Sequence, residues 1–145
     1  MHSDQATITM LFENEIKYGT ELIGQHFIKL LDYGSLKDEF GYWILQEYVG
    51  PDLLWHYSKD TKLQHILPDA ADQIYEIYTI FREHNIYKLN MAMANLTHNN
   101  GVVKAFDFKY TVPRSPEMRP FEVHAINSWM RKIDIGLPER LLTIV

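Results

Sequence analysis

The segment 68–84 constrains the fold most, because its apolar residues recur at the spacing of one helix face. Ile74, Ile77, Tyr78 and Phe81 stand at positions i, i+3, i+4 and i+7, which predicts a helix with one buried stripe. Such a stripe is stable only when it packs against other elements. The chain is therefore expected to fold around a core to which this helix contributes.

The remaining patterns add helices and short strands in a fixed order. Expected helices cover 8–23, 52–58 and 121–133, and expected strands cover 27–33, 42–49, 95–97 and 102–106. The first two strands form a hairpin with a longer loop, and Asn99-Asn100-Gly101 supplies the turn between the last two. No repeat or linker interrupts this order, so residues 1–145 predict a single α+β domain in which helices predominate.

Composition argues against several classes of function. The net charge is -5 and no basic face stands out, so nucleic acid is not an expected partner. The chain has no cysteine, which excludes disulfides, zinc–thiolate sites and thiol catalysis. No stretch approaches the roughly 20 apolar residues that span a bilayer, and the first residues do not resemble a signal peptide. We expect a cytoplasmic protein, in its own cell or in a host, without membrane contact.

Four quoted segments, taken in order, resemble the protein kinase family. Glu15 is followed by "GQHFIKLLDYG", residues 42–53 read "YWILQEYVGPDL", and two later segments read "EHNIYKLNMAMANL" and "NNGVVKAFDFK". These are similar to the helix glutamate and the strand after it, the hinge, the catalytic loop and the strand pair that ends in Asp-Phe-Gly. The resemblance runs from about residue 12 to residue 130. It implies a mostly helical kinase-like C-lobe with a short β-hairpin and an N-terminal helix, while most of the N-lobe is missing.

The same resemblance assigns candidate site residues. It places Gln46 at the gatekeeper position and Glu47 and Val49 on the adenine-facing hinge. Asn95 and Asp107 take the positions of two Mg²⁺ ligands, and amide and carboxylate oxygens suit a hard cation. The alternative is that both are turn or cap residues, because Asn and Asp bond well to local backbone.

Several positions depart from the kinase pattern. Asn90 stands where kinases have the catalytic Asp, and an amide cannot accept a proton at neutral pH. Ala92 replaces the loop lysine, and Lys109 replaces the glycine of Asp-Phe-Gly. The sequence contains no GxGxxG, and only 14 residues precede Glu15, so we expect the phosphate-covering elements to be absent. Binding of ATP with Mg²⁺ is therefore expected to be weak or absent, and no other cofactor is indicated.

Two hypotheses follow from this resemblance. The first is a non-catalytic, pseudokinase-like module that binds a protein partner or a second copy of itself through an exposed hairpin at residues 27–49. The alternative is a minimal kinase-like phosphotransferase that uses ATP and Mg²⁺ and is active only when a partner completes the nucleotide lobe. The missing base and the missing glycine-rich loop favour binding over catalysis.

Overall fold

The computed structural model describes residues 4–59, 67–133 and 136–145, and its architecture is α+β as predicted. The helices are α1 (Gln5–Glu21), α2 (Leu53–Ser58), α4 (Ala70–Glu83), α5 (Arg119–Trp129) and α6 (Leu137–Leu142), with 3-10 turns η1 (Met93–Asn95) and η2 (Met130–Ile133). The strands are β1 (Leu30–Ser35), β2 (Tyr42–Gln46), β3 (Ile86–Lys88), β4 (Leu96–Asn99), β5 (Val102–Ala105) and β6 (Thr111–Pro113).

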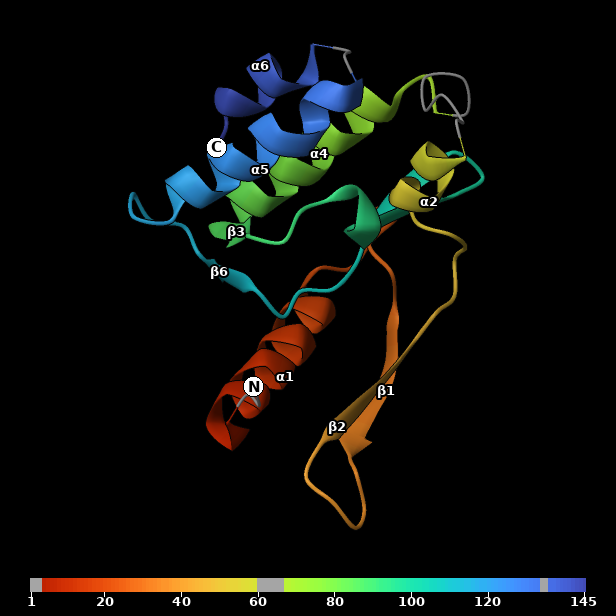
Figure 1. Cartoon of the computed structure of the whole chain (residues 1–145), viewed down its shortest axis with the longest axis vertical. Coiled ribbons are helices and arrows are strands. Elements are labelled where there is room, and N and C mark those ends of the chain that lie inside the picture. The colour runs from red at the N-terminus through yellow and green to blue at the C-terminus, as the bar shows by residue number, and fades with distance from the viewer. Residues whose placement is uncertain (1–3, 60–66, 134–135) are drawn as a thin grey trace.

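Helix α4 confirms the strongest prediction from the sequence. Its predicted stripe is buried in full, at Ile74, Ile77, Tyr78 and Phe81. The helix ends before Asn85, which has a left-handed backbone with φ of 57° that stops the helical run. Helix α6 packs against both α4 and α5, the hydroxyl of Tyr78 on α4 donates a hydrogen bond to Glu122 on α5, and Figure 1 shows the three helices gathered at one end of the molecule.

The strands form three separate antiparallel pairs, β1 with β2, β3 with β6, and β4 with β5. The predicted first hairpin is confirmed, but its strands are shorter than expected. Phe27 does not join β1, because it is buried in the core and bridges to Ala105 of β5. Figure 1 shows this hairpin beside α1, extending away from the helices α4, α5 and α6. The hairpin is thus attached to the core at its base and projects from it.

Two features were not predicted. Strands β3 and β6 have three residues each, too few for an alternating pattern to stand out. Helix α6 follows a left-handed Gly136 with φ of 70° and buries Leu137 and Leu141.

The predicted helix 121–133 starts two residues earlier, at Arg119, and its last turn tightens into η2. Among the described residues, no helix has the length and apolar character needed to cross a membrane.

Candidate functional site

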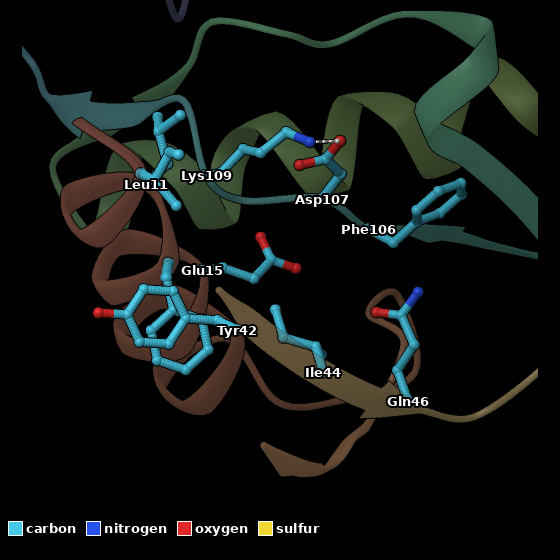
Figure 2. A pocket seen from close by; sticks show the side chains of 10 residues that line it. Leu11, Glu15, Tyr42, Ile44, Gln46, Phe106, Asp107 and Lys109 are labelled. Carbon is cyan, nitrogen blue, oxygen red and sulfur yellow. Dashed lines mark ion pairs between the residues drawn. The ribbon is translucent and has the colours of Figure 1, made fainter. Parts of the chain in front are cut away.

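A cleft of about 530 Å³ lies between α1, β2 and the segment 106–109 (Figure 2). Strand β2 lines it with alternate residues, Tyr42, Ile44 and Gln46, as the period of a strand requires. At one end the ring of Phe12 stacks on Tyr42 with centroids 4.2 Å apart, which joins α1 to β2. The cleft is mainly apolar, and its charged groups come from Glu15 of α1 and from the segment 106–109.

Glu15 is the most buried charged residue of this cleft. Its carboxylate accepts a hydrogen bond from the backbone N–H of Phe108, which ties α1 to the segment after β5. Burial raises the pKa of Glu15, the bond from Phe108 opposes that rise, and the nearby charge of Asp107 adds to it. In Figure 2 the Glu15 side chain points from α1 into the space below Lys109 and Asp107. The resemblance to kinases had singled out this glutamate, and the structure places it on the cleft.

Asp107 and Lys109 form an ion pair on the opposite side of the cleft. The Nζ atom of Lys109 lies 3.5 Å from Oδ2 of Asp107. In the resemblance to kinases Lys109 stands at the position of a glycine, and a lysine lacks the easy access of glycine to a positive φ. Instead the left-handed residue is Asp107, with φ of 67°, a conformation that Asp tolerates better than most residues. The lysine is therefore accommodated without backbone strain, and its ammonium group faces the carboxylate.

Asn90 is held inside a hydrogen-bond network behind this ion pair. Its side-chain oxygen accepts from Nζ of Lys88 at 2.9 Å, and its side-chain nitrogen donates to the carbonyl of Asp107 at 3.1 Å. The side-chain nitrogen of Asn95 donates to the carbonyl of Asn90 at 2.8 Å. Both ends of the Asn90 amide thus serve to hold the loop, and neither end of the amide can act as a base.

Lys88 is a functional candidate that the sequence did not reveal as buried. Its side chain is fully buried, and its Nζ lies 5.5 Å from the centre of the Phe108 ring. Burial lowers the pKa of Lys88 to about 8, although Asp107, Glu15 and Glu122 favour its charged form. No sequence pattern marks a lysine as buried, because three-residue strands such as β3 show no inward-facing period.

The predicted metal ligands Asn95 and Asp107 belong to the same network, which Asn90 links. The ammonium group of Lys109 lies 3.5 Å from one carboxylate oxygen of Asp107, so its positive charge opposes the binding of a divalent cation there. Asn95 also bonds to local backbone, as the alternative of a turn residue predicts. The part of the chain described contains no cluster of three or more acidic or histidine residues suited to a metal. In this arrangement the two residues fit a metal poorly, and the metal site stays a prediction.

The predicted adenine-facing residues lie outside the cleft, which ends at Gln46. The backbone N–H of Glu47 donates to the carbonyl of Lys29 at 3.0 Å, and its carboxylate accepts from the N–H of Lys29 at 2.8 Å. Glu47 lines a separate cavity of about 480 Å³ near the C-terminal end of α1. Val49 is half-buried and does not line the cleft. The assignment of Glu47 and Val49 to nucleotide binding stays a prediction.

A second buried acid lies in the helical part of the core. Glu122 of α5 accepts a hydrogen bond from the hydroxyl of Tyr78 of α4 at 2.9 Å. Its other carboxylate oxygen has no hydrogen-bond partner within the described ranges. Burial raises the pKa of Glu122 to about 7, and burial together with Glu122 raises that of Tyr78. Neither residue of this pair lines the cleft, so the buried carboxylate bears on the stability of the core rather than on the cleft.

No protein-family model matches the chain, and no curated protein matches it. The fold and the cleft therefore define the class of this chain as an α+β protein with a largely apolar, partly acidic cleft between a helix and a β-hairpin.

Proposed function

We propose that this chain is a non-catalytic, kinase-like protein-interaction module. The observation that carries the proposal is an exposed apolar surface on the projecting hairpin. We call these residues the hairpin surface; they are Leu31, Tyr33, Leu36, Phe40, Trp43 and Leu45, with 38–53% of each residue exposed. They lie on both faces of the hairpin, because Tyr33 pairs with Ile44 and packs against Phe12 on the face of α1, whereas Trp43 and Leu45 lie on the other face. Apolar side chains gathered on a two-stranded sheet of this kind are typical of a contact surface for another protein.

The order of elements supports the kinase-like part of the proposal. An N-terminal helix bearing Glu15 precedes a hairpin, a short helix and the long helix α4, followed by a loop, two small strand pairs and another helix. The bond between Glu15 and the backbone of Phe108 connects the first helix to the segment that resembles Asp-Phe-Gly. These contacts join the segments through which the sequence resembles kinases.

The absence of catalysis is supported by Asn90 and Lys109. The amide of Asn90 bonds on both sides and has no proton-accepting group, and general-base assistance contributes roughly 10²–10⁴ in rate. Lys109 neutralises the carboxylate that would hold Mg²⁺. Neither group positions or activates a substrate hydroxyl.

The alternative function, a phosphotransferase completed by a partner, is favoured by one observation. Glu15 and Asp107 both line the cleft, where a lysine and metal ions supplied with a second lobe would need them. That alternative requires a proton acceptor other than Asn90, which the partner would also have to bring.

Sedimentation of the full chain tests the proposal. At tens of micromolar we expect a species heavier than the 17.1 kDa monomer, in which the hairpin surface is buried. Leu45→Glu should return the protein to the monomer mass, since it places a charge in this surface. Phe121→Glu is the matched control, because Phe121 is a similarly exposed apolar residue on α5. A monomeric wild type, or equal effects of the two substitutions, would argue against the hairpin surface as a contact site.

A further inference from the structure

Along one edge of β2, the backbone groups have no hydrogen-bond partner among the residues that the structure describes. The N–H of Glu47 and the C=O of Gly41 both bond to the β1 side of the hairpin. Along each strand of an antiparallel pair, successive residues direct their N–H and C=O groups alternately toward the partner strand and away from it. The backbone groups of Tyr42, Ile44 and Gln46 therefore face away from β1. Within the described ranges, β1 is the only strand paired with β2. These outward groups span about 13 Å, at the usual rise of a strand.

This edge lacks the devices that normally protect a free strand. Strand β2 reads "YWILQ" and contains no charged residue and no proline. The irregular register of the hairpin lies in β1, between Leu30 and Asp32, rather than in β2. Free edges are usually protected by lysines, prolines or bulges against pairing with other chains. An unprotected edge of this composition is suited to accept another strand.

The same edge borders the cleft. The residues whose backbone groups face outward, Tyr42, Ile44 and Gln46, are also those whose side chains line the cleft. On the side of α1 the wall is apolar, with Ile8, Leu11 and Phe12. A strand added to β2 would therefore have backbone partners on one side and an apolar helix face beside it.

The charge of the cleft favours a basic side chain. Lys109 forms an ion pair with Asp107, whereas Glu15 feels the nearby charges of Lys88 and Lys109 but forms no direct ion pair in the residues that the structure describes. Its carboxylate is buried and points into the cleft, so an incoming ammonium or guanidinium group would gain a partner that is shielded from water. A second copy of β2 has no basic residue to offer.

We propose that this cleft is an insertion site for one extended strand of a partner protein. The strand pairs with the free edge of β2, packs apolar side chains against α1, and directs a Lys or Arg toward Glu15. The inference rests on the proposed function as a protein-interaction module and names the chemistry of the partner. It concerns the cleft side of β2, while the hairpin surface includes Trp43 and Leu45 on the opposite side.

A strand fused to the full chain tests this proposal without knowledge of the partner. Thr-Val-Thr-Lys-Thr-Val-Thr is joined to the N-terminus by a flexible Gly-Ser linker, because Ile8, in the first turns of α1, lines the cleft. A short flexible linker provides a local concentration in the millimolar range. The fusion is made in the Leu45→Glu background, so that association through the hairpin surface does not contribute. Amide hydrogen exchange is then measured residue by residue.

We expect amide exchange at Tyr42, Ile44 and Gln46 to slow by about tenfold or more. The amides of Trp43 and of the position that carries the Leu45→Glu substitution already bond to β1, so their exchange should change little. Replacing the fused lysine by Met, or introducing Glu15→Gln, should remove most of this protection. The Gln substitution retains an oxygen that can accept from Phe108. A fusion with prolines in place of the valines is the control that cannot pair.

Unchanged exchange at the three amides would overturn the insertion site. Equal protection with lysine and with Met would overturn the role of Glu15. Protection by ATP alone would also overturn the proposal, since it would identify a small-molecule site. A failure here leaves the sedimentation behaviour of Leu45→Glu and Phe121→Glu unaffected, so the two proposals can fail separately.

Discussion

The ammonium nitrogen of Lys109 lies 3.5 Å from Oδ2 of Asp107, so the carboxylate expected to hold a metal ion is paired with a lysine of the same chain. This pair is partly exposed, with 45% of the lysine side chain and 25% of the aspartate side chain accessible. Its contribution to stability is therefore small, on the order of a few tenths of a kcal/mol. Its larger consequence is chemical, because a fixed positive charge repels divalent cations from this carboxylate.

We expect wild-type protein to show no saturable thermal shift with micromolar ATP and Mg²⁺. Lys109→Ala should increase the affinity of the cleft for Mn²⁺ or Mg²⁺, since it leaves the Asp107 carboxylate unpaired. Lys104→Ala is the control, because Lys104 pairs with Glu47 outside the cleft. This affinity is measured by titrating Mn²⁺ into the protein and recording its effect on the relaxation rate of water protons. Identical titrations for both variants would contradict a blocking role of Lys109.

Stability should depend on pH in the alkaline range through Lys88. The pKa of Lys88 is lowered by burial to about 8 in the folded protein, against 10.5 for the exposed side chain. Between these values the unfolded state binds more protons, so the free energy of unfolding rises with pH. The full difference between the two pKa values of Lys88 corresponds to about 3 kcal/mol in the free energy of unfolding, and part of this gain is present by pH 10. Above pH 10 the raised pKa of Tyr78 makes the free energy of unfolding fall as pH rises.

Urea unfolding at pH 8 and pH 10 measures this dependence. Lys88→Met should abolish most of the rise, because methionine has a similar length and no titrating group. Lys37→Met, in the exposed hairpin loop, should leave the rise unchanged. A rise of equal size in Lys88→Met would locate the pH dependence elsewhere.

Glu122 should give the opposite dependence at lower pH. Burial raises the pKa of Glu122 to about 7 from 4.5. Between pH 4.5 and 7 the folded state binds more protons than the unfolded state, so the free energy of unfolding falls as pH rises. Glu122→Gln keeps an acceptor for the Tyr78 hydroxyl and removes the buried charge. It should therefore stabilise the protein at pH 8 by on the order of 1 kcal/mol or more and flatten the acidic pH profile.

The exposed Glu13 of α1 provides the control for this prediction, since Glu13→Gln removes a carboxylate that is not buried. Denaturant unfolding of both variants across pH 5–8 separates the two cases. Destabilisation by Glu122→Gln at pH 8 would show that the buried carboxylate forms stabilising contacts as an anion.

The buried stripe of α4 should dominate the stability of the core. Ile77→Ala removes a fully buried side chain and is expected to cost about 2–5 kcal/mol, including the cavity that remains. Ile23→Ala, at a residue that is 80% exposed, should change the free energy of unfolding by less than about 0.5 kcal/mol. Urea unfolding of the two variants gives both numbers, and similar costs would show that Ile77 is not part of a close-packed core.

The elements predicted from the sequence are those with a clear apolar period or a strong turn. Helix α4 is an example, because four side chains on one face determine both its type and its buried side. The strand pair β3–β6 joins Tyr87 to Val112 across 24 intervening residues, and three-residue strands provide no period from which to infer the pairing. The sequence therefore predicts the local helices and hairpins, whereas it does not predict the pairing of short strands that lie far apart in the chain.

The candidate site was predicted only in part, for a physical reason. The positions of Glu15 and Asp107 came from a resemblance, and the structure places both at one cleft. The engagement of Asn90 by Lys88 and the burial of Glu122 depend on how distant segments pack. A charged residue looks the same in the sequence whether solvent or protein surrounds it.

Transfer of radiolabelled phosphate from ATP tests the central claim, a binding role without catalysis, most directly. The full chain is compared with the double variant Asn90→Asp with Ala92→Lys, which restores the base and the loop lysine. We predict no transfer to protein substrates by either form, because Lys109 remains on Asp107 and the described residues include no glycine-rich loop that could position the phosphates. Transfer by the wild-type chain alone would contradict the account.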